Sequence, residues 1–367
     1  MIHLQRSMLA GLDETAPTLG SVQAALQNAV ELEHATIPVY LYALYSLDPS
    51  VNGLIAKIIQ SVVVEEMLHM TLASNVLNAL NGSPQIDKPD FIPDYPGPLP
   101  GGVESELTVN LAPFSPDQLA AFLTIEAPEH PLPIEAAPAA DAPLTIGQFY
   151  GKIIAAIKAL GDGVFVNPPR NQVTPDIMWG AIVVSNVETA VQALTIIVEQ
   201  GEGTSTSPEE VGGSDDAIGG EYAHYYRFMQ IQKGHLLVPA PGETPPYAYA
   251  GGPVPFDPSG VYAVPTNPSS KGSKAYSGAQ AFANNNFNYT YTSLLSTLHD
   301  FFNGEATADK FNRALGLMMS LKSQAKAMTA GVPDVGVFTG PSFEYQPVNP
   351  GPPPTGTGSD RPAAPAA

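Results

Sequence analysis

The chain has 367 residues and a formal net charge of -20, which results from 35 acidic and 15 basic side chains. This balance argues against a nucleic-acid or anionic-membrane partner, because phosphate groups are bound by basic surfaces. The absence of cysteine excludes disulfides, thiolate metal ligands and a cysteine nucleophile. The sequence shows no signal peptide and no long apolar run, so we expect a cytoplasmic protein without a membrane span.

The first predicted elements are two long helices. Between residues 18 and 46, apolar side chains recur every three to four positions, which is typical of a helix, and Pro38 should kink it. The same pattern predicts a second helix from 54 to 80, which ends at the turn-forming sequence that begins at Asn81. Because the connection between them is short, the two helices should pack as an antiparallel hairpin.

The rest of the chain alternates between helices and segments rich in proline and glycine. Residues 85–142 form one such segment, which we expect to be a crossover with one strand near 106–111, and residues 239–272 form the other. Apolar periodicity predicts five further helices, at 146–160, 174–200, 215–233, 289–302 and 307–330.

These elements predict an all-α protein in three parts. Residues 1–237 contain four long helices and should form a four-helix bundle. Residues 238–346 should form a C-terminal helical extension that packs on the bundle. Residues 347–367 are a low-complexity tail rich in proline and glycine.

Several helices carry acids and histidines where the helical pattern calls for apolar residues. Glu33 interrupts the apolar stripe of the first helix, and Glu66 and His69 continue the stripe of the second as Glu-x-x-His. Glu221 and His224 repeat Glu-x-x-His in the helix at 215–233. In a helix this spacing places both side chains on one face. A carboxylate is too costly to bury without a partner, so these residues predict a cation site inside the bundle.

The ligand from the 174–200 helix remains open on the spacing alone. Glu188 and Glu199 lie three helical turns apart and therefore share a face. The separation from Glu33 to Glu66 equals the separation from Glu188 to Glu221, which favours Glu188. Pairing residues that should lie at the same level in the 174–200 and 215–233 helices favours Glu199.

The predicted ligand set defines a class of metal centre. One Glu from each of two helices, and Glu-x-x-His from each of two others, is the set found in di-iron and di-manganese bundles. Carboxylate and neutral imidazole suit iron or manganese. We therefore predict two Fe ions, with Mn as the alternative, and oxidation of a small-molecule substrate by O₂ or peroxide. Four carboxylates would serve in catalysis and as ligands, together with His69 and His224. Three of them are Glu33, Glu66 and Glu221, and the fourth is Glu188 or Glu199.

Four sequence blocks resemble the ferritin-like domain of iminophenyl-pyruvate dimer synthases, the enzymes of violacein- and rebeccamycin-type biosynthesis. The blocks are ELEHATIPVYLYALYSL from Glu31, EEMLHMTLASNVLNALNGSP from Glu65, IIVEQGEGT from Ile196 and HYYRFMQI from His224. The later GPSFEY, from Gly340, is also similar to the family's end. With these blocks the resemblance extends from about residue 18 to about residue 345.

The resemblance implies a ferritin-like four-helix bundle and the same frame of metal ligands, in a stand-alone member of the family. It implies that the VEQGEG block carries a ligand, which selects Glu199, with Glu188 and Glu202 in reserve. Oxidative coupling of imines of an aromatic 2-oxo acid is then an alternative activity. Iron storage without an organic substrate is a further alternative, but it would require a shell-forming multimer, and the long irregular segments argue against close shell packing. The oligomeric state, including a homo-oligomer, stays open.

Overall fold

The computed structural model describes residue 12 and residues 17–100, 107–128, 145–204, 207–209, 222–272, 275–331 and 336–346. Within this part of the chain, α-helices carry nearly all the regular structure, which confirms the predicted all-α fold. The other elements are short: β1 (Val238–Pro239) and β2 (Tyr247–Ala248), which pair antiparallel, and the 3-10 helices η1 (Pro89–Phe91), η3 (Asp162–Val164) and η4 (Pro258–Gly260). None of the described helices combines the length and apolar character needed to cross a membrane. The predicted tail, residues 347–367, lies outside the described residues.

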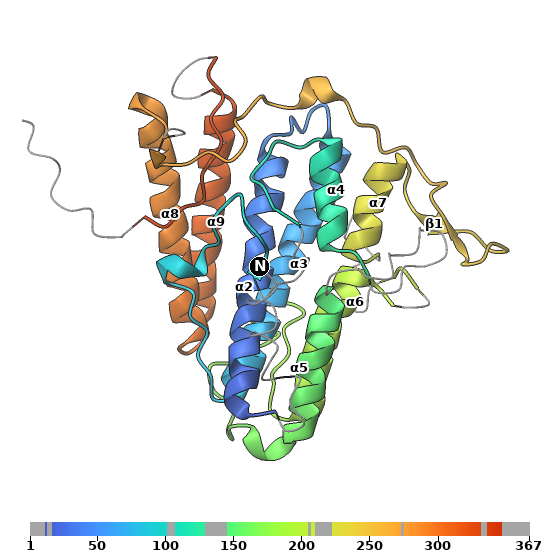
Figure 1. Cartoon of the computed structure of the whole chain (residues 1–367), viewed down its shortest axis with the longest axis vertical. Helices are drawn as coiled ribbons and strands as arrows, with labels where there is room; N and C mark the ends of the chain where they lie inside the picture. Colours follow the sequence, from blue (N-terminus) through green and yellow to red (C-terminus); the bar gives the residue numbers. More distant parts are fainter. Residues whose placement is uncertain are drawn as a thin grey trace, which may run out of the picture.

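The predicted N-terminal hairpin is present as α2 (Leu19–Tyr45) and α3 (Gly53–Ala79), which pack along each other (Figure 1). Thr18 and Ser21 form a capping box at the start of α2, which satisfies backbone N–H groups that the first helical turn leaves free. The chain leaves α3 through Gly82, where a Cβ atom would lie 2.9 Å from the carbonyl oxygen of Leu77. This turn therefore requires glycine.

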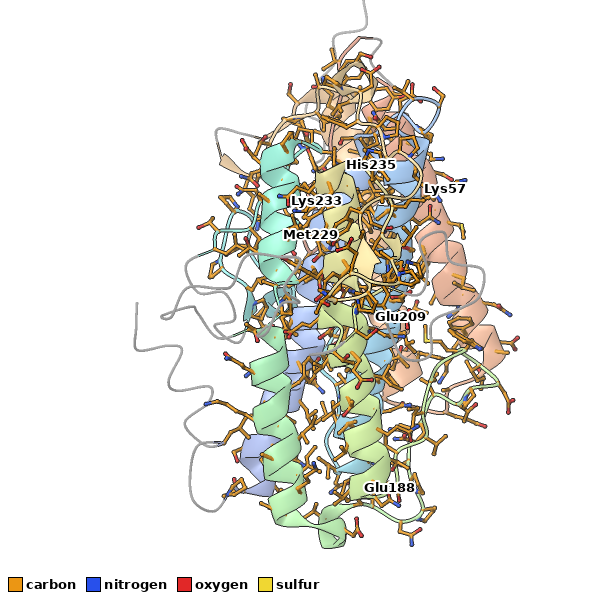
Figure 2. All side chains as sticks on the ribbon, turned by 90° about the vertical axis from the view of Figure 1, so that its right-hand side faces the viewer. Lys57, Glu188, Glu209, Met229, Lys233 and His235 are labelled. Carbon is orange, nitrogen blue, oxygen red and sulfur yellow. The ribbon has the colours of Figure 1, made fainter. Side chains whose placement is uncertain are left out.

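The other half of the bundle consists of two columns, each made of a short helix stacked on a longer one (Figures 1 and 2). One column is α4 (Pro116–Ile125) above α5 (Ile146–Leu160), and the other is α7 (His224–Lys233) above α6 (Val187–Glu202). The columns run side by side, because α4 packs on α7 and α5 packs on α6. Both columns are interrupted at one level, so the ends of four helices meet in the middle of the bundle.

The long helix predicted at 174–200 is shorter than expected, since α6 begins only at Val187. Asn75 on α3 explains the irregular path before it. The Asn75 side chain accepts a hydrogen bond from the backbone N–H of Val173 and donates to the carbonyl oxygens of Val173 and Ile182. These backbone groups are therefore satisfied by α3 rather than by a helix of their own.

The segment at 85–142 is less irregular than predicted, because it contains α4. Ser115 caps this helix by accepting a hydrogen bond from the backbone N–H of Gln118, and Pro116 occupies its first turn, where proline is favoured. The expected strand near 106–111 is wrong for the described residues. Only an isolated antiparallel bridge between Gly97 and Val109 occurs there.

The helix predicted at 215–233 begins in the structure at His224, because Tyr222 and Ala223 before it are not helical. The earlier part of the prediction, residues 215–221, lies outside the described residues. This start point brings the His224 side chain to the level at which the columns are interrupted.

The C-terminal helices form a second hairpin, α8 (Gly278–Phe302) and α9 (Ala308–Thr329), which packs against α2 and α3 (Figure 1). The predicted start of α8 at residue 289 is too late. Asn284 and Asn288 belong to the helix and are buried, where both donate hydrogen bonds to the Ser342 hydroxyl. Their polarity hid the first turns of this helix from the apolar pattern.

Candidate metal centre

Five buried side chains converge where the two columns are interrupted. Glu33 comes from α2, and Glu66 and His69 come from α3, one turn apart on the face toward the columns. Glu126 is the C-terminal cap of α4, and His224 is the first residue of α7. All five residues are buried, with at most 3% of their surface exposed, so water does not screen their charges.

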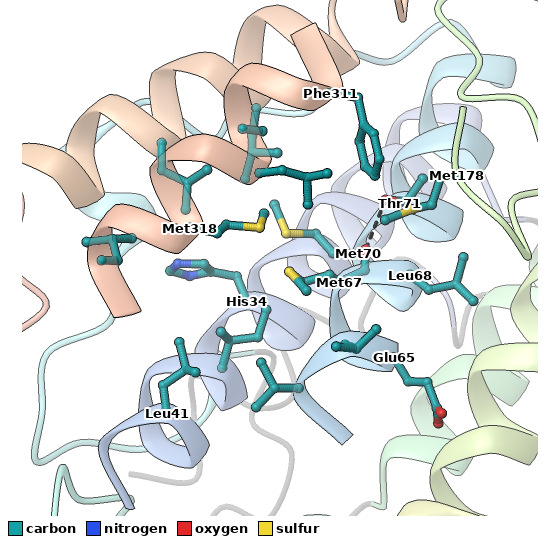
Figure 3. A pocket seen from close by; sticks show the side chains of 18 of the residues that line it. His34, Leu41, Glu65, Met67, Leu68, Met70, Thr71, Met178, Phe311 and Met318 are labelled. Carbon is teal, nitrogen blue, oxygen red and sulfur yellow. Dashed lines mark hydrogen bonds between the residues drawn. The ribbon is translucent and has the colours of Figure 1, made fainter. Parts of the chain in front are cut away.

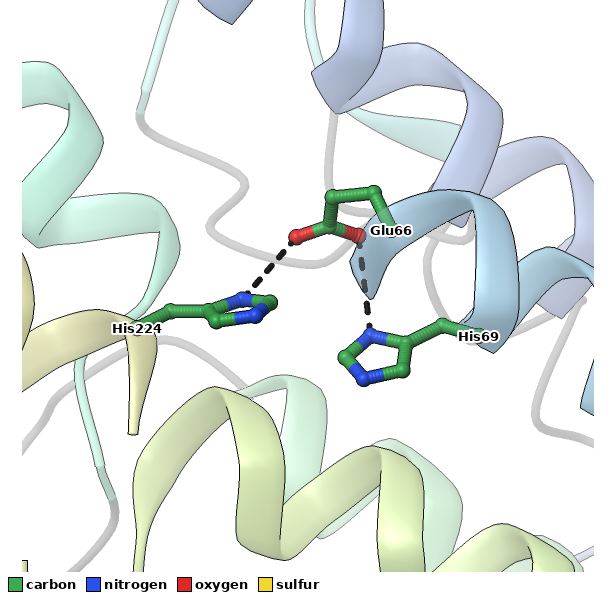
Figure 4. Close-up of side chains that lie close together, drawn as sticks. All are labelled: Glu66, His69 and His224. Atoms are coloured by element: carbon green, nitrogen blue, oxygen red, sulfur yellow. Dashed lines mark ion pairs between the residues drawn. The ribbon is translucent and has the colours of Figure 1, made fainter. Parts of the chain in front are cut away.

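The Glu66 carboxylate lies between the two histidines (Figure 4). Its Oε1 atom is 3.1 Å from His224 Nδ1, and its Oε2 atom is 3.7 Å from His69 Nδ1. Each Nδ1 atom also faces a second carboxylate. Glu33 Oε2 is 3.4 Å from His69 Nδ1, and Glu126 Oε2 is 3.6 Å from His224 Nδ1. The five residues therefore form two half-sites that share Glu66, the His69 half-site with Glu33 and the His224 half-site with Glu126.

Polar partners on the far side of the two imidazole rings fix how the rings are turned. His69 Nε2 lies 2.9 Å from the amide oxygen of Gln200, and His224 Nε2 lies 3.0 Å from Glu65 Oε2. Since both partners are acceptors, Nε2 carries the proton and donates in each case. Arg227 also donates to Glu65 and holds this carboxylate in place. The two Nδ1 atoms thus face the carboxylates, the arrangement typical of histidines that bind metals.

Two tyrosines hold the outer carboxylates. Tyr150 on α5 donates to Glu33 Oε1 at 2.5 Å, and Tyr40 on α2 donates to Glu126 Oε1 at 2.5 Å. Burial, reinforced by the nearby carboxylates, raises the pKa of both phenols above its ordinary value, so they stay protonated donors. Each tyrosine occupies the Oε1 atom and leaves Oε2 directed at a histidine.

Burial raises the pKa of Glu66 to about 7, and repulsion by Glu126 adds to this effect, although the polar contacts with His224 and His69 oppose it. Burial alone would lower the pKa of His69, but the hydrogen bonds and charges of Glu33 and Glu66 raise it to about 10. In the metal-free protein, protons therefore occupy the space between the carboxylates and Nδ1. Metal ions compete with protons for these same atoms.

The residues present fit a pair of metal ions. Within the described part of the chain, His224 Nδ1 is buried and faces the Glu66 and Glu126 carboxylates, but it forms no hydrogen bond of regular geometry, and a buried polar atom without a hydrogen bond is costly. Glu66, His69 and His224 each offer one ligand atom, and these atoms lie within 4.8 Å of one another. Three carboxylates and two imidazoles match the ligand preference of iron and manganese. Binding of cations would satisfy His224 Nδ1 and neutralise the buried acids.

Four of the residues singled out in the sequence meet in this cluster: Glu33, Glu66, His69 and His224. Glu199 does not join them, since its side chain is partly exposed and makes no hydrogen bond or ion pair with the cluster among the described residues. Its neighbour Gln200 is buried and contacts His69 instead. Glu221 lies outside the described residues.

The two reserve residues have different positions. Glu188 is exposed in the first turn of α6, at the far end of that helix from the cluster (Figure 2). Glu202 is buried at the other end of α6, where its Oε1 atom accepts a hydrogen bond from the backbone N–H of Gly147.

Glu126 was not predicted from the sequence, although a signal for it exists. It directly follows the apolar run Phe122-Leu123-Thr124-Ile125, behind a serine-proline helix start at Ser115. A short amphipathic helix that ends in a buried acid is the pattern that would have identified it.

Comparisons with known proteins agree with this architecture. A family model described as Ferritin-like matches residues 26–233. The fold is similar to the crystal structure of a ferritin-like protein from Caulobacter vibrioides, with a TM-score of 0.56 and 23% sequence identity, over 85% of this chain and 98% of that chain. No curated protein matches the chain.

Proposed function

Because the chain belongs to the ferritin-like family, we propose that its buried cluster holds two metal ions and that the protein is a non-haem di-metal oxidoreductase. The ligands would be Glu33, Glu66 and His69 on one ion and Glu66, Glu126 and His224 on the other. We propose iron as the metal, with manganese as the alternative, and a small organic molecule as the substrate that O₂ or peroxide oxidises.

The position of Glu66 carries this proposal. Its two oxygen atoms face two different histidine nitrogens, and each of these nitrogens faces a further carboxylate. A single ion would use only one half of this arrangement, whereas a carboxylate shared by two ions uses all of it. The same division into two Glu-plus-His halves is found in carboxylate-bridged di-metal bundles.

When bound, the ions would supply electrons and open coordination positions for reaction with the oxidant. The chain itself performs the other tasks. Gln200 and Glu65 hold the imidazole rings in one orientation, and Tyr150 and Tyr40 hold the outer carboxylates. Burial of all five ligands excludes bulk water from the centre. The site is therefore preorganised before any ion enters it.

Metal content per chain tests the proposal. The wild type, expressed with supplied iron and manganese, should contain about two metal ions per chain, and Glu66→Ala should contain almost none because both half-sites lose their shared ligand. Glu199→Ala is the matched control and should match the wild type. If the apo protein takes up no Fe(II) under anaerobic conditions, the oxidoreductase proposal fails.

Substrate screening separates the narrower possibilities. Oxidative coupling of imines of aromatic 2-oxo acids is the narrower activity that the four sequence blocks support, and mass spectrometry would detect the coupled product. If metal-loaded protein consumes O₂ only in proportion to added Fe(II), and light scattering shows a shell-sized multimer, iron storage replaces the oxidoreductase proposal.

A further inference from the structure

A cavity lies beside the metal centre, between the α2–α3 hairpin and the α8–α9 hairpin (Figure 3). Its volume is about 490 Å³, within the range of roughly 300–1,000 Å³ that is typical of small-molecule sites. Apolar side chains form most of its lining. The innermost of these, including Met70, Leu295 and Phe302, are at most 3% exposed. The cavity is thus too deep to be a flat docking surface for another protein.

One polar side chain inside this cavity has an unused hydrogen-bonding atom. His34 is 4% exposed, and its Nε2 atom lies 2.6 Å from the Tyr291 hydroxyl, which also lines the cavity. Its Nδ1 atom is buried and has no hydrogen-bond partner in the part of the chain that the structure describes. A buried polar atom without a partner is costly, so a ligand that offers one polar group to His34 would remove that cost.

The entrance of the cavity is apolar and exposed. Val64, Trp179 and Met319 line it and are 52%, 63% and 62% exposed, respectively. Large apolar side chains gathered around an opening mark a place where apolar molecules bind. Met67, Met318 and further methionines in the lining can adapt their shape to a flexible occupant.

The cavity also reaches two residues that contact the histidines of the metal centre. Glu65 and Gln200 line it, and the same two side chains hydrogen-bond the Nε2 atoms of His224 and His69. A molecule in the cavity therefore lies against the groups that orient the two imidazole rings.

We propose that this cavity binds one largely apolar small molecule, of the acyl-chain or terpenoid type, whose single hydroxyl or carbonyl group hydrogen-bonds to His34 Nδ1. Binding depends on the cavity and not on the metal ions, so this proposal stands or falls separately from the oxidoreductase proposal.

The single tryptophan of the chain provides a direct assay, because Trp179 lies at the entrance. The neutral probe N-phenyl-1-naphthylamine is added to the full-length protein, as purified and after dialysis against EDTA. We expect saturable binding of about one probe per chain, with energy transfer from Trp179, in both samples. Binding that does not saturate, or that occurs without energy transfer, would overturn the proposal.

Two variants locate the probe through its own emission. Met318→Trp fills the cavity from α9 and should weaken probe binding by about tenfold or more. Phe282→Trp places the same indole on α8 at a position that is 68% exposed and outside the cavity lining, and it should bind like the wild type. Circular dichroism confirms that both variants fold. Equal binding by the two folded variants would place the probe elsewhere and contradict the assignment.

A third comparison tests the polar contact, and it uses displacement of the probe by 1-decanol. His34→Phe removes Nδ1 and should weaken displacement several-fold. Tyr291→Phe leaves Nδ1 in place and should keep the wild-type displacement. If His34→Phe does not change the displacement by 1-decanol, the proposed hydrogen bond does not exist.

Discussion

Replacing Glu126 by glutamine separates the two half-sites. The substitution preserves the size of the side chain but removes one of the two carboxylates that face His224 Nδ1, at 3.6 Å in the wild type. It leaves the three ligands of the other half-site unchanged, namely Glu33, Glu66 and His69. We therefore expect one ion to bind normally and the other to bind weakly.

The size of the effect follows from the role of the residue. Loss of a group that only supports a metal ligand costs roughly 10- to 100-fold in affinity. Glu126 would be a ligand itself and supplies a negative charge in a site shielded from water, so its loss should cost at least about 100-fold, or about 3 kcal/mol. At a metal concentration that just saturates the wild type, the content should fall from about two ions to about one ion per chain.

Anaerobic titration with Fe(II), followed by elemental analysis of the washed protein, measures this change. Glu199→Gln is the control, because it removes a carboxylate from the partly exposed face of α6. Two tightly bound ions in Glu126→Gln would refute the assignment of Glu126. Loss of one ion in Glu199→Gln would instead support the ligand that the sequence resemblance implied.

Two further predictions follow from the contacts around the histidines. The first concerns stability. Folding raises the pKa of Glu66 to about 7 and that of His69 to about 10, whereas burial lowers the pKa of His34 to about 3, so the folded metal-free protein holds more protons than the unfolded chain once His34 of the unfolded chain has lost its proton, above about pH 6.5. The melting temperature of EDTA-treated protein should therefore fall as pH rises from about 6.5 to about 9, and that of Glu66→Gln should fall less; equal slopes in calorimetry would contradict the shift at Glu66. The second concerns Gln200→Leu, which removes the acceptor for His69 Nε2 at similar volume and should weaken metal binding roughly 10- to 100-fold in a chelator competition assay. An unchanged affinity would show that Gln200 does not orient the ring.

The N-terminal half of the site could be predicted because its geometry is local. Glu33, Glu66 and His69 lie in two uninterrupted helices, α2 and α3, whose apolar periodicity runs the whole length and fixes which face is buried. A Glu-x-x-His within such a helix must place both side chains on one face.

The columns could not be predicted in the same way, because tertiary contacts decide where their helices start and stop. The hydrogen bonds from Asn75 to the backbone before α6 connect residues far apart in the sequence. Successive side chains on a helix point about 100° apart. The sequence alone therefore does not show whether Glu199 or the adjacent Gln200 faces the core, because the packing of the helix decides this. Glu126 was hidden for a related reason, since its helix has only 10 residues and lies within a segment rich in proline.

The two half-sites have parallel construction but unequal electrostatics. In each half-site the histidine donates a hydrogen bond from Nε2 to a side-chain oxygen. The partner of His69 is the neutral amide of Gln200, whereas the partner of His224 is the carboxylate of Glu65. A carboxylate partner makes an imidazole a stronger ligand. Arg227 offsets part of that charge, because it also donates to Glu65.

The half-site of His224 should therefore bind its ion first. His224 is also the first residue of α7, so the positive end of this helix dipole lies close to this half-site and opposes part of that preference for a cation. Comparison of Glu33→Gln with Glu126→Gln tests the order. The ion that remains in Glu33→Gln occupies the His224 half-site, and it should resist a chelator longer than the ion that remains in Glu126→Gln. The reverse order would mean that the Arg227 charge and the positive end of the α7 dipole outweigh the Glu65 carboxylate.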